Sequence, residues 1–125
     1  MINNQTLLKI KDNTGGSKAQ AIKIYKGRYA TIGDIILVSI KKLRKKINNN
    51  NKNKIIKGNI FKALVIRTIY KKKNITDNYI NFNENSIILL NNQLQPLGTR
   101  ILGPVTNKLR KIKKIKIISL SSYIL

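Results

Sequence analysis

The chain has 125 residues, of which 26 are Lys or Arg and 4 are Asp or Glu, so its formal net charge is +22. A compact protein with such an excess of one charge repels itself unless a polyanion neutralises it, so a nucleic acid is the expected partner. Cys and His are both absent, which excludes disulfides, thiol chemistry, Cys/His zinc sites and imidazole acid-base catalysis. The length predicts a single domain over residues 1–125.

The acidic residues show no catalytic or metal-binding pattern. Asp12, Asp34, Asp77 and Glu84 are far apart in the sequence and lie at predicted turns or loop edges. Glycosidase-type catalysis needs two carboxylates held close together, and neither a P-loop nor a GxGxxG pattern is present. We therefore predict no catalytic residue, no metal site, no cofactor and no enzyme activity. We interpret Asp12 as a turn residue that binds its own backbone.

The composition and the first residues also indicate the compartment in which the protein acts. No apolar run approaches the roughly 18 residues of a membrane helix, and residues 1–6 resemble neither a signal peptide nor a transit peptide. Ile, Lys and Asn make up about half of the chain, and all three have codons rich in A and T. These features favour an organelle-encoded protein of the mitochondrion, with a plastid or an AT-rich bacterium as alternatives.

The first two predicted strands flank a turn. Residues 6–10 are β-prone, and residues 12–16 are dense in turn-forming types. Residues 18–26 alternate with a period of two, as in a half-buried strand. The core face of this second strand is expected to hold Gln20, Ile22 and Ile24. In the loop that follows, Tyr29 lies beside Arg28 and either stacks on RNA or packs within the fold.

Three further apolar segments complete the predicted sheet. Residues 35–40 are β-branched enough to be buried on both faces, as in a small closed barrel. Residues 60–68 have apolar residues on both faces near their end, and residues 86–90 form the last strong strand. The fold is therefore predicted to be mainly β, with a small closed five-stranded β-barrel. Its expected core includes Ile36, Val38, Val65 and Leu89.

The remaining segments are basic. Residues 44–54 are rich in Lys and Asn and predict a mobile basic loop. Residues 71–73 are lysines, and the alternation in residues 79–82 indicates a hairpin with a basic tip.

Two Pro/Gly pairs in residues 95–105 predict a rigid connection that holds Thr99 and Arg100 outward. Pro104 is expected at the first position of a C-terminal helical segment, residues 104–120, with two short helices. Apolar residues recur there at three- and four-residue spacing, which predicts one apolar face and one cationic face.

Six motifs carry a family resemblance: Asp12–Gly16, Gly33–Ile36, Lys57–Gly58, Arg67–Thr68, Gln95–Val105 and Lys116–Leu120. With these motifs the chain resembles the L-fourteen family of ribosomal large-subunit proteins from residue 1 to residue 125, apart from length changes in two loops. The resemblance implies a β-ribbon projecting from the barrel, and a place at the subunit interface. It also implies large-subunit rRNA, small-subunit rRNA at intersubunit bridges, and proteins of the L-three and L-nineteen families as partners. Thr99, Arg100 and Lys116 match a docking site for a ribosome-silencing factor.

The cations are spread over several segments, which suits a protein wedged among RNA helices. Arginines weigh more in this prediction because a guanidinium binds phosphate with two parallel hydrogen bonds. The expected RNA-binding residues are Lys23, Arg28, Lys41, Arg44, Arg67, Lys71, Lys72, Lys73, Arg110 and Lys113.

The predicted function is a structural constituent of the ribosomal large subunit. One alternative is an OB-like nucleic-acid-binding protein outside the ribosome, which would need exposed aromatic residues on the sheet. Another is a cationic protein of membrane surfaces, for which residues 106–120 have an amphipathic face.

Overall fold

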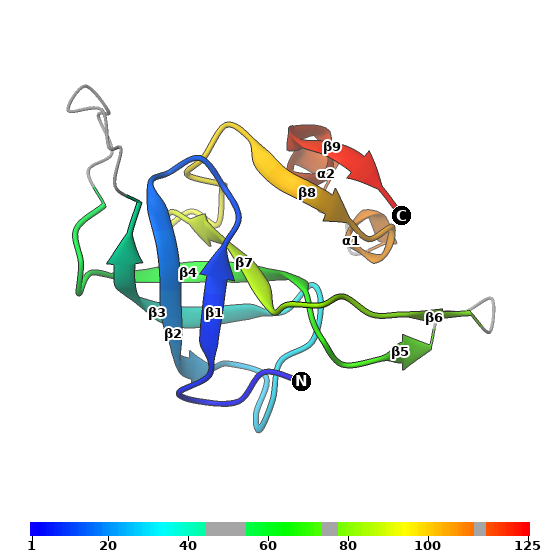
Figure 1. Cartoon of the computed structure of the whole chain (residues 1–125), viewed down its shortest axis with the longest axis horizontal. Coiled ribbons are helices and arrows are strands. Elements are labelled where there is room, and N and C mark those ends of the chain that lie inside the picture. Colours follow the sequence, from blue (N-terminus) through cyan, green and yellow to red (C-terminus); the bar gives the residue numbers. More distant parts are fainter. Residues whose placement is uncertain (45–54, 74–77, 112–114) are drawn as a thin grey trace.

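Five strands form a closed barrel at the centre of the protein. A computed structural model describes residues 1–44, 55–73, 78–111 and 115–125. The barrel strands are β1 (Leu7–Ile10), β2 (Gly16–Ile24), β3 (Ile35–Leu43), β4 (Ile60–Arg67) and β7 (Ser86–Leu90) (Figure 1). They pair in the order β1-β2-β3-β4-β7, and a parallel pairing between β1 and β7 closes the barrel. The predicted five-stranded β-barrel is confirmed.

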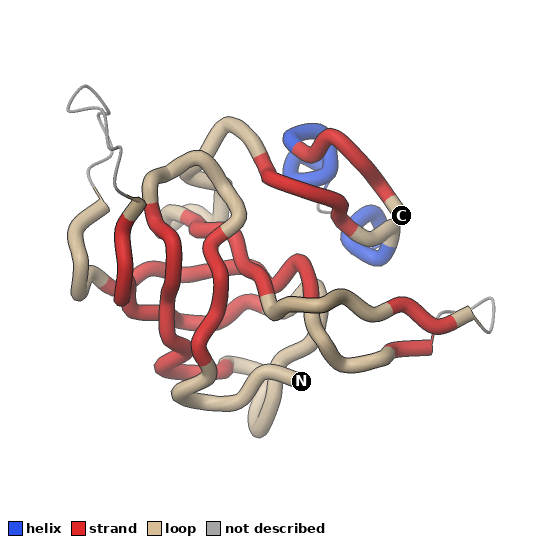
Figure 2. The backbone as a smooth tube through the Cα atoms, viewed as in Figure 1, coloured by secondary structure: helices blue, strands red, loops and turns tan. Residues whose placement is uncertain are grey.

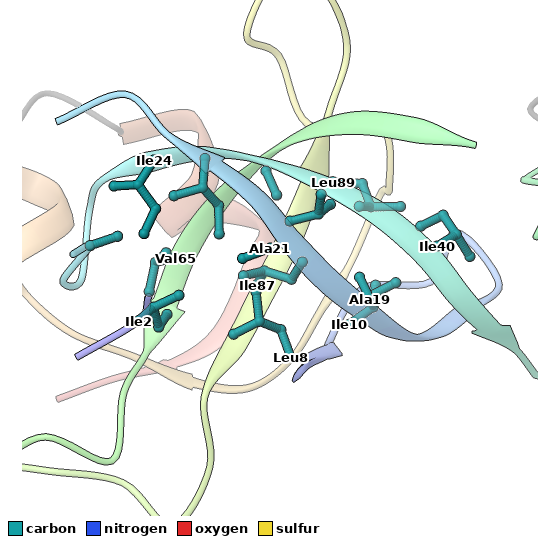
Figure 3. Packing of buried hydrophobic residues seen from close by; sticks show 14 of the residues in the cluster. Ile2, Leu8, Ile10, Ala19, Ala21, Ile24, Ile40, Val65, Ile87 and Leu89 are labelled. Carbon is teal, nitrogen blue, oxygen red and sulfur yellow. The ribbon is translucent and has the colours of Figure 1, made fainter. Parts of the chain in front are cut away.

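The barrel interior is filled by alternate residues of its strands (Figure 3). The expected core residues Ile36, Val38, Val65 and Leu89 are all fully buried there. In β3 the burial alternates, because Ile35, Leu37 and Ser39 are only half-buried on the outer face. The expectation that this strand is buried on both faces is therefore wrong.

Strand β2 turns the opposite face inward from the one we predicted. Ala19 and Ala21 are fully buried, whereas Ile22 is 42% exposed. A register shift between Ala21 and Lys23 then resets the alternation, so that Ile24 is buried again. Small residues fit the narrow interior of a small barrel, and a bulge of this kind leaves no signal in a period-of-two pattern.

Strands β4 and β7 are buried on both faces. Their inner residues, such as Val65 and Leu89, belong to the barrel core. Their outer residues Leu64, Ile66, Ile88 and Leu90 belong to a second apolar cluster. That cluster is completed by the C-terminal part of the chain: Ile101, Val105, Leu109, Ile117 and Ile118.

The C-terminal block consists of β8 (Ile101–Val105), α1 (Lys108–Lys111), α2 (Ile115–Leu120) and β9 (Ser121–Ile124). Strands β8 and β9 pair in parallel, and the two short helices connect them (Figure 2). Two short helices were predicted, whereas β8 and β9 were not.

The expected helix start at Pro104 is wrong. Pro104 lies within β8, opposite Tyr123, and the first helix begins at Lys108. Gly103 has a φ of 87°, outside helical geometry, and the β8/β9 register shifts between Ile101 and Pro104. Proline is tolerated in strands at such irregular edge positions.

A two-stranded ribbon projects from the barrel (Figure 1). It is formed by β5 (Lys72–Lys73) and β6 (Tyr79–Ile80), which pair antiparallel. This confirms the predicted ribbon. Its tip at residues 74–77, and the predicted mobile loop from residue 45 onward, lie outside the described residues.

Candidate RNA-binding surface

The acidic side chains of the described residues are all engaged within the protein. Asp34 accepts hydrogen bonds from the backbone N–H and hydroxyl of Thr31 at 2.8 and 3.1 Å, and its Oδ2 lies 3.6 Å from Lys26 Nζ. Asp12 is 2% exposed and accepts hydrogen bonds from the backbone N–H and hydroxyl of Thr14. This confirms that Asp12 binds its own turn.

Asp12 also joins the turn to the barrel. Its Oδ2 accepts a hydrogen bond of 3.0 Å from the backbone N–H of Leu89 in β7. Burial raises the pKa of Asp12, because desolvation disfavours the charged form, although its hydrogen bonds act in the opposite direction. The carboxylate is thus a structural group enclosed by the fold.

Arg67 and Glu84 form the centre of a second internal cluster. Arg67 Nη1 donates a hydrogen bond of 3.0 Å to Glu84 Oε1, and its Nη2 donates to the backbone carbonyl of Leu102. The guanidinium lies against Gly103, where an added Cβ would come within 2.9 Å of Nη2. Arg67 therefore connects β4 to the ribbon base and to β8.

These internal contacts leave Arg67 little exposed surface for the RNA contact that we expected of it. Its side chain is 8% exposed, so the guanidinium is enclosed by protein. Glu84 was missed as a partner because the two residues are 17 positions apart and the ribbon separates them. The sequence signal for this pair was the position of Glu84, an acidic residue at the base of a predicted hairpin in a chain with few acids.

Glu84 also forms ion pairs with one lysine of β1 and one that directly follows this strand. Its carboxylate lies 3.0 Å from Lys9 Nζ and 3.4 Å from Lys11 Nζ, and it accepts a hydrogen bond of 3.1 Å from the hydroxyl of Ser86. Desolvation by partial burial acts to raise the pKa of Glu84. The hydrogen bonds and the two lysine charges outweigh it, so its pKa is lowered below the usual 4.5.

We expect this cluster to make stability pH-dependent. A carboxyl group with a lowered pKa in the folded state contributes stability above its unfolded pKa, and this contribution is lost as the pH falls through the folded value. Glu84→Gln should cost about 1.5 to 3 kcal/mol at neutral pH, because hydrogen bonds to a charged group are lost. Urea unfolding of both proteins between about pH 7 and pH 3 should show the difference shrinking below the usual 4.5 of a Glu. A difference that stays constant would show that the carboxylate charge is not the stabilising element.

The predicted cations, by contrast, are mostly exposed. Lys23 on β2, Arg28 in the loop after β2, Lys41 on β3, Lys71 before β5, and Arg110 on α1 are all exposed. Arg44 is half-buried and donates a hydrogen bond of 3.3 Å to the carbonyl of Ile10. The side chains of Lys72 and Lys73, and the whole of Lys113, lie outside the described residues. The predicted RNA-binding residues thus lie on several elements and do not gather at one site.

Two exposed lysines lie over exposed tyrosine rings. Lys23 Nζ is 5.4 Å from the centre of the Tyr25 ring, and Lys71 Nζ is 4.8 Å from that of Tyr79. Tyr29 is 45% exposed, so its ring is not packed within the fold. Its stacking on RNA stays a prediction.

Thr99 and Arg100 are held by a residue that sequence analysis missed. The side chain of Asn13 donates a hydrogen bond of 2.7 Å to the Thr99 hydroxyl. Its Oδ1 accepts hydrogen bonds from the backbone N–H groups of Thr99 and Arg100 at 2.8 and 3.3 Å. Gly98 allows this approach, since an added Cβ would lie 2.7 Å from Asn13 Oδ1. The segment is therefore fixed by a side chain of the Asp12 turn as well as by its own Pro/Gly pairs.

Arg100 and Lys116 both belong to or flank the C-terminal block. Arg100 immediately precedes β8, and Lys116 lies near the start of α2, the helix that leads into β9. Since Ile101 and Ser121 pair where the two parallel strands begin, Arg100 lies at the end of the sheet where α2 joins β9. Thr99, Arg100 and Lys116 are all exposed.

The model of the family Ribosomal protein L14p/L23e matches residues 1–125. The chain belongs to this family. L14p/L23e proteins are structural, non-enzymatic constituents of the ribosome, so membership implies rRNA and ribosomal proteins as partners. The resemblance noted in the sequence is thereby confirmed over the whole chain.

The geometry does not favour either alternative function, the OB-like nucleic-acid-binding protein or the cationic protein of membrane surfaces. The barrel strands contain one aromatic residue, Phe61, which is half-buried against the core, so they offer no stacking platform of the OB type. The apolar residues Leu109, Ile117 and Ile118 of the amphipathic segment are buried against β4 and β7. No helix in the described part of the chain has the length and apolar character needed to cross a membrane.

Proposed function

We propose that the protein lies at the interface side of a large ribosomal subunit, where it binds large-subunit rRNA and contributes to intersubunit bridges with small-subunit rRNA. The observation that carries this proposal is the distribution of charge. The described carboxylates are engaged inside the fold or by neighbouring cations, whereas lysines and arginines are exposed on strands, loops, the ribbon and the C-terminal block. Cations on several sides suit a protein enclosed by RNA helices, where phosphate contacts fix its position.

The exposure of the predicted cations decides most of the proposed rRNA-binding set. The set keeps five exposed cations and the half-buried Arg44: Lys23, Arg28, Lys41, Arg44, Lys71 and Arg110. Lys72, Lys73 and Lys113 remain in the set on the sequence alone. Arg67 is removed from it, because its guanidinium is committed to Glu84 and Leu102.

The proposed bridge or partner surface consists of Thr99, Arg100 and Lys116. Support comes from the loop geometry, because a segment already fixed by Asn13 loses little conformational entropy when it binds a partner. From the family resemblance we propose that proteins of the L-three and L-nineteen families are neighbours, and that a ribosome-silencing factor docks at this surface. The AT-rich composition favours a mitochondrial ribosome, with a plastid or an AT-rich bacterial cytoplasm as the alternative.

We expect Arg100→Ala to weaken binding of the silencing factor or subunit joining. Truncating one partner of a hydrogen-bonded charge pair at an interface costs about 2 to 5 kcal/mol of binding free energy. Lys116→Ala should have a smaller effect, since an ammonium lacks the planar guanidinium that binds with two parallel hydrogen bonds. Assembly is measured by sedimentation of tagged variants with the large subunit in a mitochondrial lysate, and joining by the yield of complete ribosomes.

Asn13→Ala is the matched control, because it leaves the charge of Arg100 unchanged and removes only its anchor. We expect an intermediate loss of joining or factor binding, with incorporation into the large subunit retained for all three variants. Failure of assembly, with normal factor binding in the particles that do form, would instead make Arg100 an rRNA anchor. If the protein sedimented apart from large subunits in the lysate, the proposed function itself would be wrong.

A further inference from the structure

Three neighbouring strands bring lysines side by side on the outside of the barrel. In the β1/β2 pairing Lys9 lies opposite Lys18, and in the β2/β3 pairing Lys18 lies opposite Lys42. All three residues are exposed. We call Lys9, Lys18 and Lys42, together with the adjacent Lys41, the lysine row.

A β-bulge builds the β3 end of this row. Lys18 pairs with Lys42 while Ala19 pairs with Ile40, so Lys41 is an extra residue on β3. Up to Ile40 the strand alternates between buried and half-buried residues, but Lys41 and Lys42 are both exposed. Bulges commonly re-aim side chains and are features of the fold. Here the bulge gives the row two adjacent lysines where regular alternation would expose only one.

The row costs the free protein stability. Like charges directly opposite one another on neighbouring strands are destabilising. Lys9 is relieved by Glu84 at 3.0 Å, but among the described residues no carboxylate lies within ion-pair distance of Lys18, Lys41 or Lys42. An arrangement that is unfavourable in the free protein is stabilised when an anion binds it.

We propose that the lysine row is a binding site for the phosphate backbone of a single RNA strand running across β1, β2 and β3. This inference rests on the proposed rRNA-binding function and assigns it a site. Neighbouring strands are about 4.8 Å apart, and long, flexible lysines on such a ladder can reach successive phosphates. RNA is favoured over an acidic protein because the row itself contains only ammonium groups, without an aromatic or Arg anchor of the kind that dominates protein interfaces.

The test measures stability and RNA affinity in the same variants of the full chain. Lys18→Gln should raise the thermal unfolding midpoint by about 1 to 4 °C, because two like-charge pairs are relieved. It should also weaken binding to a short RNA duplex and to poly(U) about 5- to 10-fold near 0.1 M salt, with the slope of log K against log salt reduced by about one. Lys42→Gln should weaken RNA binding alike but raise the midpoint less, because it relieves only the pair with Lys18. The double variant should gain less stability than the sum of the two, because they share that pair.

Lys23→Gln is the matched control for the stability measurement on the same strand. Lys23 is exposed but lies opposite Leu37, so its neutralisation relieves no like-charge pair. It removes the contact with the Tyr25 ring, and should therefore not raise the unfolding midpoint. A rise in midpoint for Lys18→Gln without loss of RNA affinity would overturn the inference while leaving the proposed function intact. Loss of affinity for poly-glutamate but not for RNA would overturn it in favour of an acidic protein partner. If no lysine variant changed RNA affinity, the proposed rRNA binding would fail as well.

Discussion

Raising the salt concentration is expected to weaken RNA binding by the isolated protein more than any single substitution does. A protein that neutralises about 6 to 10 phosphates loses about 10³- to 10⁵-fold in affinity between 50 and 200 mM salt, because binding releases condensed counterions. The net charge is +22, and the described acidic side chains are engaged inside the fold. The protein therefore has enough free cations to contact that many phosphates. The measurement is a titration of structured rRNA fragments at several salt concentrations.

A matched variant shows whether the slope comes from the proposed residues. Arg28→Gln combined with Lys71→Gln removes exposed cations from the loop after β2 and from the ribbon, and should reduce the slope by about two. Lys26→Gln is a useful comparison, since Lys26 lies 3.6 Å from Asp34 and is already partly neutralised. A nearly flat titration of the unsubstituted protein would contradict the inference that a polyanion is the partner.

What the sequence could predict depended on local pattern. The runs of β3, β4 and β7 have enough β-branched residues to be recognised as strands, and each supplies residues to the core as expected. The two-faced burial of β4 could also be predicted, because Ala63, Leu64, Val65 and Ile66 leave no polar face. These features are set by neighbours within a few residues, so a single chain reveals them.

What the sequence could not predict depends on which distant residues become neighbours. The inward face of β2 was predicted wrongly because one bulge reverses the pattern. The partners Arg67 and Glu84, and likewise Asn13 and Arg100, meet only after the barrel has closed and the C-terminal block has packed on it. The lysine row has the same origin, since Lys18 and Lys42 become opposite only through strand register. The sequence alone shows how many cations the protein has, whereas the structure is needed to show which of them lie side by side.

Replacing Ile36 with alanine is expected to cause the largest loss of stability among the substitutions considered. Ile36 is fully buried, and on its strand it lies between Ile24 of β2 and Ala63 of β4. Removing its side chain loses buried apolar surface and leaves a cavity that the closed barrel cannot readily fill, at a cost of about 2 to 5 kcal/mol. That loss is large against the 5 to 15 kcal/mol by which domains are typically stable. Urea unfolding followed by far-UV circular dichroism measures it, since the chain has no Trp.

Ile22→Ala provides the comparison within the same barrel. Ile22 is the same residue type on β2, but its side chain is 42% exposed, so truncation should cost less than about 1 kcal/mol. Ile36→Val keeps most of the buried volume and should cost about 0.5 to 1.5 kcal/mol. If Ile36→Ala and Ile22→Ala were equally mild, the barrel interior would be able to collapse around the missing side chain. The second cluster, which joins β4 and β7 to the C-terminal block, would then have to supply most of the stability.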